Sequence, residues 1–398
     1  MTSSEGRREK KGRRVKRRRI LFITGTRADF GKLKPLIEAT TKTQGFEAAI
    51  FATGMHMLAR YGATVNEIRK AKFRNIFTYI NQDGWRATEM DLVLATTVQG
   101  VGHYVREYPP DLLVVHGDRV EALAGAIVGA LNNILVAHIE GGEVSGTVDE
   151  LIRHSVTKLS HLHFVANDVA RNRLLQMGER VSSIFTIGSP DVDVMLSDHL
   201  PSIRAVKAKY GIKFADYLVL LYHPVTTELP SLRGHAKAVF DAVKASEMKA
   251  VVIYPNNDAG ADVIFEEIGQ IRRDPQFRII PSMRFEYFLA LLKNAVAIVG
   301  NSSAGIREAP VYGVPTVNVG TRQLNRYSHE SIVNVPEEKN AILGALRSLP
   351  TGLAPSMHFG KGESARLFRE CLLSPQFWKT SPQKQFRDVS LVGEGGEA

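Results

Sequence analysis

Residues 111–143 read DLLVVHGDRVEALAGAIVGALNNILVAHIEGGE and contain one complete repeating unit of the fold. The apolar run LLVVHG (112–117) predicts a buried strand, EALAGAIVGAL (121–131) predicts a helix, and ILVAHIE (134–140) predicts the next strand. A strand, a helix and a second strand in this order form a parallel pair, because the helix carries the chain back to the same end of the sheet. The stretch therefore predicts an α/β fold with a parallel sheet covered by helices.

The same alternation of strands and helices continues on both sides of this stretch. RILFITGTRADFGKLKPLIEA (19–39) predicts a strand, a turn and a helix, and FEAAIFATGMH (46–56) predicts another strand that ends in a glycine turn. A second series of short apolar runs, each ending in Gly, Pro, Asn or Ser, comprises YLVLLYHP (217–224), KAVVIYPNN (249–257), FRIIPS (277–282), AVAIVGNSS (295–303) and VPTVNVG (314–320). The pattern predicts two parallel sheets in series.

The length of the chain supports two domains, because a single core stops growing at roughly 250–300 residues and the chain has 398. We expect a first domain over residues 19–190, a second over 191–362, and a helical tail over 363–398. No apolar run approaches the roughly 20 residues of a membrane helix, and the polar N-terminus lacks the apolar segment of a signal peptide. The single cysteine excludes an internal disulfide. We therefore expect a cytoplasmic protein with no membrane partner.

A basic segment opens the chain. Residues 1–19 hold ten of the 51 Lys and Arg and two of the 41 Asp and Glu, so they account for +8 of the net charge of +10. Such a block of like charge is typical of a disordered tail, which we expect over residues 1–18. The tail could contact nucleic acid or an acidic membrane surface, or reflect a start codon placed too early. A solvated extension is the simpler interpretation, and a nucleic-acid partner is not expected.

Polar motifs occur where the strands of the first domain are predicted to end, and open parallel sheets bind ligands at that edge. GTRADFG (25–31) follows the first strand and opens a helix, so its amides and Arg27 could hold a phosphate, although a glycine turn after a strand is common. HGDR (116–119) places a His, an Asp and an Arg at one strand end, where they are costly unless paired or functional. An Asp that caps the next helix is the alternative interpretation.

The next strand ends in HIEGGE (138–143), and further polar residues follow on a predicted helix at 149–154. Alternation points the side chains of His138 and Glu140 to the same side of their strand. Carboxylates beside imidazoles suit general acid–base chemistry. The same residue types can bind metal, but no HExxH or comparable ligand spacing occurs, so we expect neither a metal nor another cofactor.

The second domain carries its own motifs at strand ends. Proline after His223 ends the strand and fixes the histidine in an extended conformation, where it is either a ligand contact or structural. GNSSAGIRE (300–308) supplies serine hydroxyls and helix amides for a diphosphate, and Glu308 could accept ribose hydroxyls. A serine cap with a nearby glutamate explains the same string without a ligand. GTRQ (320–323) adds a cation nearby, so we expect the site in an interdomain cleft.

These strings together resemble the hydrolysing UDP-N-acetylglucosamine 2-epimerases of sialic-acid and legionaminic-acid biosynthesis. The resemblance covers roughly residues 19–380 and rests on GTRADFG, HGDR, HIEGGEVSGTVDELIRHSVTKL, HPVTTE, YPNNDAG, GNSSAGIRE and GTRQ in this order. HIEGGEVSG favours the hydrolysing branch, because non-hydrolysing relatives have HVEAGLR-like text there. The resemblance implies a glycosyltransferase-B-type fold: two Rossmann-like domains, an interdomain active-site cleft, and a C-terminal helix that packs back on the first domain.

The resemblance also implies a reaction and its residues. The family eliminates the nucleotide diphosphate in the anti sense to give a 2-acetamidoglucal, and adds water in the syn sense to give N-acetylmannosamine. Asp118, Glu140 and Asp149 match catalytic carboxylates, with base and acid unassigned, and His223 is a further catalytic candidate that matches a position at the diphosphate. The matches to the nucleotide site are Arg27, Arg119, Asn256, Phe288, Ser302, Ser303, Glu308 and Arg322, with Phe288 near the uracil.

The sequence leaves the substrate and two rival functions open. FATGMH, INQD, LATTVQG and SMRFEYF look closer to the branch that acts on N,N′-diacetylbacillosamine nucleotides, in which the nucleotide is GDP or UDP. A glycosyltransferase of the same fold would not need three clustered carboxylates, and incubation without an acceptor separates the two activities. A non-catalytic binding protein would depend on residues 1–19. We expect a nucleotide-sugar substrate and a homo-oligomer, either a dimer or a tetramer.

Overall fold

The computed structural model describes residues 17–83, 89–145 and 148–389. The predicted tail therefore lies outside the described residues, except for Arg17 and Arg18. Arg18 already belongs to the first strand, and its guanidinium lies 3.9 Å from the centre of the Trp378 ring. Across the described ranges, no helix combines the length and the apolar character needed to span a bilayer.

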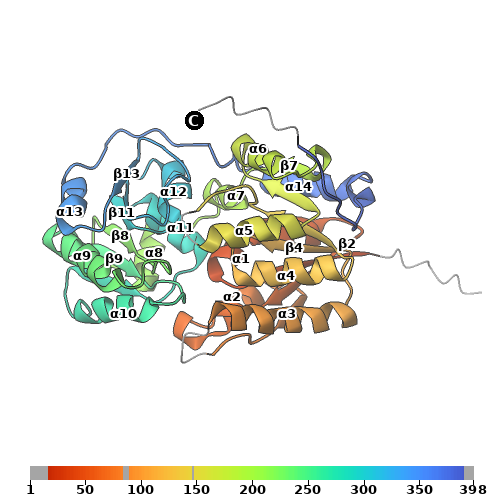
Figure 1. Ribbon diagram of the computed structural model, residues 1–398. Coiled ribbons are helices and arrows are strands. Elements are labelled where there is room, and N and C mark those ends of the chain that lie inside the picture. The colour runs from red at the N-terminus through yellow and green to blue at the C-terminus, as the bar shows by residue number, and fades with distance from the viewer. Residues whose placement is uncertain (1–16, 84–88, 146–147, 390–398) are drawn as a thin grey trace, which may run out of the picture.

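The first domain is built on a seven-stranded parallel sheet (Figure 1). Its strand order is β3 (Asn75–Thr78), β2 (Phe46–Ala52), β1 (Arg18–Thr24), β4 (Leu112–His116), β5 (Leu135–Ile139), β6 (Leu162–Val165) and β7 (Ile184–Thr186). This order is that of a Rossmann fold, in which the direction of strand addition reverses between the first and the fourth strand.

Helices cover both faces of this sheet, which explains why its strands are apolar along their whole length. Ile20 and Phe22 of β1 point into one core and Leu21 and Ile23 into the other. The first core lies under α1 (Arg27–Lys42) and α2 (Val65–Lys70), and the second under α3 (Met90–Glu107), α4 (Val120–Leu131) and α5 (Val148–Leu159). The helices α6 (Asp168–Gln176) and α7 (Pro190–Met195) follow β6 and β7.

The second domain repeats this plan with a six-stranded parallel sheet. Its strand order is β10 (Phe277–Ile280), β9 (Ala250–Ile253), β8 (Leu218–Leu221), β11 (Ala297–Gly300), β12 (Thr316–Val319) and β13 (Ile332–Val335). One face packs against α9 (Leu232–Ala245), α10 (Ala261–Gln270) and α13 (Lys339–Arg347), and the other against α8 (Ile203–Tyr210), α11 (Phe285–Lys293) and α12 (Ala304–Arg307). The fold is therefore two Rossmann-like domains, as expected from the sequence.

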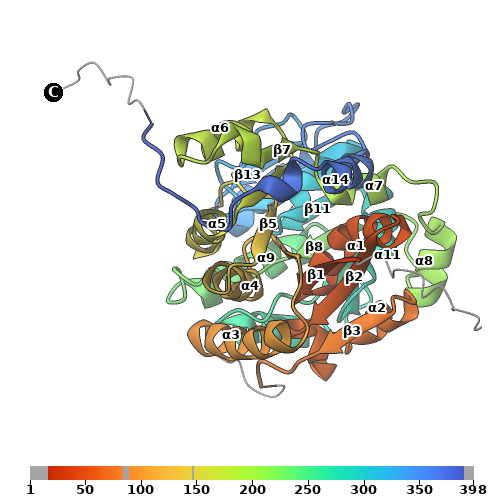
Figure 2. The same cartoon turned by 90° about the vertical axis from the view of Figure 1, so that its right-hand side faces the viewer.

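The chain crosses between the two domains twice. The first crossing follows β7, and the predicted boundary after residue 190 falls within α7. The second leads to α14 (Ser364–Leu373), which lies on the first domain and buries Phe368 and Leu372 in its core (Figures 1 and 2). The two crossing segments touch, because the amide of Ser189 donates a hydrogen bond to the carbonyl of Phe359 at 2.6 Å.

Helices α1 and α11 meet where the domains face each other. A Cβ atom at Gly31 would lie 2.5 Å from the Cβ of Phe285, so a side chain at Gly31 would force the two helices apart. Beside this contact, Lys34 of α1 donates to Glu286 of α11 at 2.5 Å. The absence of a side chain at one position therefore permits the close approach of the domains.

Candidate active site

A cavity of about 310 Å³ lies between the carboxyl ends of the two sheets. The segments after β1, β4 and β5 line one side, and those after β8, β9 and β11 line the other. Among the predicted site residues, the cavity wall contains Arg27, Asp118, Arg119, Glu140, His223, Asn256, Phe288, Ser302, Ser303, Glu308 and Arg322. Asp149 is not part of the wall. The reversal points of both sheets thus open into one cavity, which is where such sheets bind ligands.

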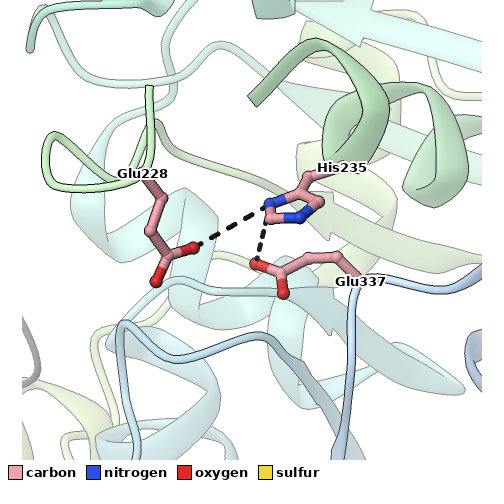
Figure 3. Close-up of side chains that lie close together, drawn as sticks. All are labelled: Glu228, His235 and Glu337. Carbon is pink, nitrogen blue, oxygen red and sulfur yellow. Dashed lines mark ion pairs between the residues drawn. The ribbon is translucent and has the colours of Figure 1, made fainter. Parts of the chain in front are cut away.

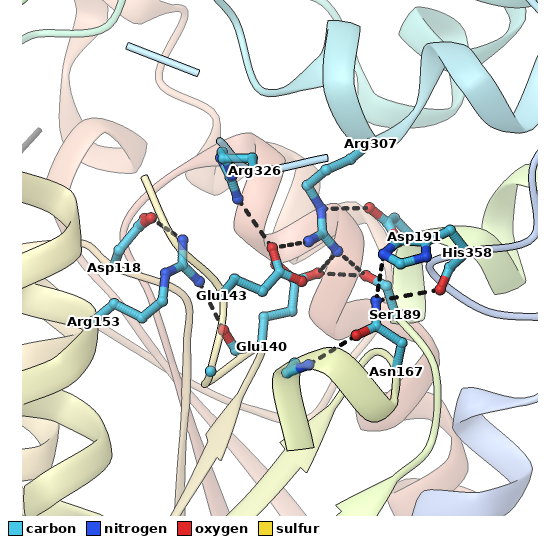
Figure 4. Close-up of polar contacts among 12 residues, drawn as sticks. Asp118, Glu140, Glu143, Arg153, Asn167, Ser189, Asp191, Arg307, Arg326 and His358 are labelled. Carbon is cyan, nitrogen blue, oxygen red and sulfur yellow. Dashed lines mark hydrogen bonds and ion pairs between the residues drawn. The ribbon is translucent and has the colours of Figure 1, made fainter. Parts of the chain in front are cut away.

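The carboxylate of Glu140 lies within a buried ion network (Figure 4). Arg307 Nη2 donates to Glu140 Oε1 at 2.7 Å, and the Ser189 hydroxyl donates to the same oxygen. Lys32 Nζ lies 3.8 Å from Oε1, and His116 Nε2 lies 3.3 Å from Oε2. Burial raises the pKa of Glu140, but the charges of Arg307, Lys32 and His116 together outweigh burial and hold the pKa well below its usual value. Glu140 is therefore held as a carboxylate.

Two buried cations of this network connect the domains. Arg307 of α12 also donates to Glu143 in the first domain. Lys32 of α1 lies 3.1 Å from Asp191 and 3.3 Å from Glu308 of the second domain. Burial lowers the pKa of Lys32, but the three carboxylates around it raise the pKa by more. Each cation thus compensates negative charge across the domain boundary, and this favours the closed arrangement.

Asp118 pairs with Arg153, and Figure 4 shows the two side chains facing each other. Arg153 also donates to the backbone carbonyl of Glu140 at 2.7 Å. Burial raises the pKa of Asp118, but the charges of Arg153, Arg326 and Arg322 outweigh burial and lower the pKa. The alternative interpretation of Asp118 as a helix cap is wrong, because α4 begins after Arg119 and no side chain caps it.

Asp149 lies on α5 and contacts Arg322, a residue of the cavity wall. Arg322, which lines the cavity, donates from Nη2 to Asp149 Oδ2 at 3.0 Å. Burial and the negative charge of Asp118 raise the pKa of Asp149, and Arg322 only partly opposes this. Asp118 and Asp149 are therefore shifted in opposite directions, an arrangement that separates a base from an acid.

His223 is held in one tautomer by its surroundings. Its Nδ1 accepts the backbone N–H of Asn256 at 3.0 Å, so the neutral ring carries its proton on Nε2. Burial lowers the pKa of His223 well below its usual value, and Arg322 and Arg119 lower it further. His223 can therefore donate one hydrogen bond as a neutral group, but it is poorly suited to taking up a second proton.

Asp258, on the loop after β9, contacts two further predicted site residues, Arg119 and Asn256. Arg119 Nη1 lies 3.4 Å from Asp258 Oδ1, and Arg119 Nη2 donates to Asn257 Oδ1 at 3.0 Å. The amide of Asn256 also donates to Asp258. The loop after β9 and the motif after β4 are thus joined across the cavity.

The wall of the second domain combines an apolar part with hydroxyls and one carboxylate. Phe288 of α11 lies there with Ile253, Pro281 and Met283. Glu308 Oε2 is buried without a hydrogen-bond partner among the described residues, while its Oε1 faces Lys32. Burial raises the pKa of Glu308. An unsatisfied buried acceptor at a cavity wall is suited to receive a hydroxyl donor from a ligand.

The two adjacent serines lie at the start of α12, which has 4 residues. Ser303 is at the cap position but makes no side-chain hydrogen bond there, whereas the Ser302 hydroxyl accepts the N–H of Ala304 at 3.3 Å, and both residues line the cavity. Gly300 precedes them with φ of 125°, and a Cβ atom there would lie 1.9 Å from the carbonyl oxygen of Leu221. The turn therefore requires glycine, and it places the serines at the cavity.

The motif after β1 binds two of its own amides internally. Gly25 and Thr26 donate to the carboxylate of Asp29 at 2.9 and 3.1 Å, so these two N–H groups are not available to a phosphate. Arg27 instead spans the domains by donating to Ser282 at 2.5 Å and to Glu67 at 2.7 Å. Arg27 lines the cavity and brings a positive charge from this motif to it.

His56 supports this turn as a buried, neutral ring, and it gives a test of stability against pH. Burial is the main cause that lowers the pKa of His56 to about 4 from its usual 6.5. Between these values the unfolded chain binds more protons than the folded one, so the folded state is fully favoured above pH 6.5 and loses stability as the pH falls towards 4. We expect the unfolding temperature of the wild type to fall more steeply over this range than that of His56→Gln. If the unfolding temperatures of the wild type and of His56→Gln change equally with pH, the prediction is wrong. The control is His103→Gln, which removes an exposed histidine and should keep the pH dependence of the wild type.

Comparison with known proteins assigns the chain to a family. The sequence profile described as UDP-N-acetylglucosamine 2-epimerase matches residues 38–373. The chain belongs to the UDP-N-acetylglucosamine 2-epimerase family. It is 47% identical over 380 residues to the UDP-N-acetylglucosamine 2-epimerase of Neisseria meningitidis serogroup B, covering 94% of this chain and 100% of that protein. It is 36% identical over 333 residues to the hydrolyzing UDP-N,N′-diacetylbacillosamine 2-epimerase of Legionella pneumophila, covering 83% and 88%.

A solved structure shows the same architecture. The crystal structure of UDP-GlcNAc 2-epimerase from Neisseria meningitidis bound to UDP-GlcNAc matches with a TM-score of 0.75 at 16% sequence identity, covering 89% of this chain and 99% of that one. At this identity the likeness concerns the fold, which is of the glycosyltransferase-B type. The family membership makes this chain an enzyme, a nucleotide-sugar 2-epimerase.

In this 2-epimerase, the sequence motifs did not reveal the residues that hold the carboxylates in place. Those residues are Lys32, His116, Glu143, Arg153, Ser189, Asp191, Arg307 and Arg326. Five of them (Lys32, His116, Glu143, Arg153 and Arg307) stand inside or beside quoted motifs, but most of their partners lie in distant parts of the chain. One sequence signal could have indicated Arg307: it is a charged residue at a position that the helix after a strand is expected to bury. His138, by contrast, is structural, since its Nε2 lies 2.8 Å from the Gly117 carbonyl.

Proposed function

We propose that this enzyme is a hydrolysing nucleotide-sugar 2-epimerase of nonulosonic-acid biosynthesis. Its substrate is UDP-N-acetylglucosamine or a 2,4-diacetamido sugar linked to UDP or GDP, and its products are the free manno-configured N-acetyl sugar and the nucleotide diphosphate. The relatives in Neisseria meningitidis and Legionella pneumophila support the two sugar classes. The observation that carries the proposal is one cavity with ionised Asp118 and Glu140 on one side and the unsatisfied Glu308 on the other.

The chemistry of inversion explains why several carboxylates gather here. In the elimination, a base takes the proton from C2, the C1–O bond breaks, a C1=C2 double bond forms, and the electron pair leaves with the diphosphate. In the hydration, water adds to C1 and gives up a proton, while C2 receives a proton on the face opposite to the one that lost it. One group cannot serve both faces, so at least two proton-transfer groups are needed.

The pKa directions divide these roles among the carboxylates. Asp118 is ionised and reaches the cavity, so we assign it the removal of the C2 proton. Asp149 has a raised pKa and meets the cavity at Arg322, so we assign it the delivery of a proton during hydration. Glu140 stays charged beside Arg307 and Lys32, and it balances the positive charge that develops at C1 as the bond to the diphosphate breaks.

The nucleotide half of the cavity has donors where the leaving group gains charge. Arg119, Arg322 and the Nε2–H of His223 line this region, and neutral His223 can donate without losing its own proton. The hydroxyls of Ser302 and Ser303 add two more donors. Phe288 offers an apolar surface for a base, and Glu308 offers an acceptor for the ribose hydroxyls. Preorganised donors at a developing anion are a major source of rate enhancement.

The proposed roles also divide between the predicted domains. We assign the catalytic carboxylates to residues 19–190, the nucleotide to residues 191–362, and the return helix to residues 363–398. The cytoplasmic location and the homo-oligomer, a dimer or a tetramer, stay predictions from the sequence.

The reaction itself is tested by proton NMR in deuterated water, with a panel of UDP- and GDP-linked N-acetylhexosamines and no acceptor. We expect free nucleotide diphosphate and a free manno-configured sugar that carries deuterium at C2, because the proton removed and the proton returned belong to different groups. A product still attached to the nucleotide would exclude the hydrolysing reaction. A requirement for an added acceptor would favour a glycosyltransferase.

Glu308→Gln tests the nucleotide half of the cavity. Loss of the charged acceptor should raise KM and weaken inhibition by UDP by about 10-fold or more, with a smaller effect on kcat, since the contact exists in both ground and transition states. Glu286→Gln is the matched control, because Glu286 also pairs with a lysine of α1 across the domains but lies outside the cavity. Unchanged UDP affinity in Glu308→Gln would show that the nucleotide site is misplaced.

A further inference from the structure

Three side chains outside the cavity converge on one point of the second domain (Figure 3). Glu228 lies in the loop after β8, His235 in the first turn of α9, and Glu337 directly after β13. His235 Nδ1 lies 3.9 Å from Glu228 Oε2 and 3.7 Å from Glu337 Oε1. One potential ligand atom from each residue lies within 4.8 Å of the other two.

The contacts within this cluster do not explain the convergence. Distances of 3.7 and 3.9 Å are too long for N–H···O hydrogen bonds, which span about 2.7–3.2 Å. Within the described ranges of the chain, no lysine or arginine forms an ion pair with Glu228 or Glu337. Burial raises the pKa of Glu337, His235 lowers it and Glu228 raises it, with a net rise, and the Glu337 side chain is only 9% exposed. Two carboxylates therefore face one imidazole nitrogen, with no lysine or arginine paired to either of them in the described part of the chain.

A metal ion would fit this space with little movement. Zinc binds nitrogen and carboxylate oxygen at about 2.0–2.2 Å, so neighbouring ligand atoms stand roughly 3–3.5 Å apart around it. The separations of 3.7 and 3.9 Å from His235, and a separation of the glutamate ligand atoms within 4.8 Å, need an inward shift of these side chains, of which Glu228 and His235 are partly exposed. One imidazole and two carboxylates suit zinc or manganese, whereas calcium and magnesium prefer oxygen alone. We propose that Glu228, His235 and Glu337 bind a divalent transition-metal ion, with water as the remaining ligands.

The carboxylates of this site are tied to two loops that reach the cavity. Glu228 belongs to the loop that begins with His223, and its Oε1 accepts the Thr321 hydroxyl at 2.5 Å. Thr321 precedes Arg322, which lines the cavity as His223 does. Glu337 lies against the same turn, because a Cβ atom at Gly320 would fall 1.9 Å from its Oε1. The ion would therefore brace the loops that carry His223 and Arg322, a consequence that rests on the proposed function.

Metal binding can be measured without substrate, so its outcome is independent of the proposed reaction. The full-length protein, free of any affinity tag and stripped with EDTA, is titrated with Mn²⁺, and free Mn²⁺ is followed by electron paramagnetic resonance. We expect one Mn²⁺ per chain, displaced by Zn²⁺, and a rise in unfolding temperature on metal addition. Glu228→Gln, His235→Gln and Glu337→Gln should each weaken binding at least 10-fold and lose the metal-dependent rise.

The controls separate this site from other metal contacts. His199→Gln removes an exposed histidine elsewhere in the chain and should bind Mn²⁺ as the wild type does. The unfolding temperature of each metal-free variant shows whether it is folded. The proposal is overturned if the wild type binds no ion, or if the three variants bind as tightly as the wild type. It is also overturned if binding disappears in Asp118→Asn instead, which would place the ion in the cavity.

Discussion

Replacing Asp118 by asparagine should lower kcat by about 10²- to 10⁴-fold, the usual contribution of a general base. Asparagine keeps the size of the side chain but cannot accept the C2 proton. The proposed contacts of Phe288, Ser302, Ser303 and Glu308 with the nucleotide lie on the opposite wall, so the dissociation constant for UDP should stay within a few fold. Measuring kcat for the substrate and UDP binding by calorimetry on the same protein separates the two effects.

The control for Asp118→Asn is a second carboxylate that serves structure alone. Asp193 accepts the amides of Ser364 and Ala365 at 2.9 and 2.8 Å, at the start of α14, and it does not line the cavity. Asp193→Asn should lower the unfolding temperature and leave kcat close to the wild type. If Asp118→Asn keeps most of its kcat, Asp118 is not the base, and Glu140 takes its place as the candidate.

Replacing Arg307 by alanine should reduce the free energy of unfolding by about 3–5 kcal/mol, the usual cost of removing one partner from a buried ion pair. Arg307 is buried and donates to Glu140, Glu143 and Ser189, and its loss leaves two buried carboxylates with less compensation. The pKa of Glu140 should then rise towards that of a buried acid, so activity should also fall. Urea unfolding and a pH profile of kcat measure the two consequences.

Arg366 offers a matched comparison for Arg307. It also contacts two carboxylates, Glu363 and Glu370, but on the exposed face of α14. Arg366→Ala should therefore leave the unfolding curve unchanged, because exposed ion pairs are screened by water and salt. Arg307→Lys should recover only part of the stability, since an ammonium group cannot reproduce the forked contacts of a guanidinium. Wild-type stability in Arg307→Ala would show that the network is not required for folding.

The sequence predicted the fold and the place of the site because both depend on local patterns. Apolar runs with helices between them define a parallel sheet, and the residues directly after the strands must then share one edge. This reasoning brought Asp118, Glu140, His223, Ser302 and Ser303 to one cavity without any knowledge of tertiary contacts. The carried-over residues Asn256 and Phe288 depended on family resemblance, since nothing in their immediate sequence marks them.

What the sequence could not predict is which charges meet across the domains. Arg307 and Glu140 are 167 residues apart in the chain, and only the packing of one sheet against the other brings them together. The turn after β1 shows a different limit: Asp29 accepts two of its amides, and the sequence alone does not say whether these amides bind a side chain or a phosphate. Asp149 lies in the first turn of α5, and its contact with the cavity residue Arg322 cannot be read from the local sequence.

The two crossings of the chain restrict how the enzyme can open. A single linker would let the domains swivel in any direction, but here two linkers run beside each other and are joined by the bond from Ser189 to Phe359. The easiest relative rotation of the domains is therefore a hinge motion about one axis that passes through the two linkers near Ser189 and Phe359. Ser189 also donates to Glu140 through its hydroxyl. A rotation about this axis would therefore move a residue that holds Glu140, so opening of the cavity would change the surroundings of that carboxylate.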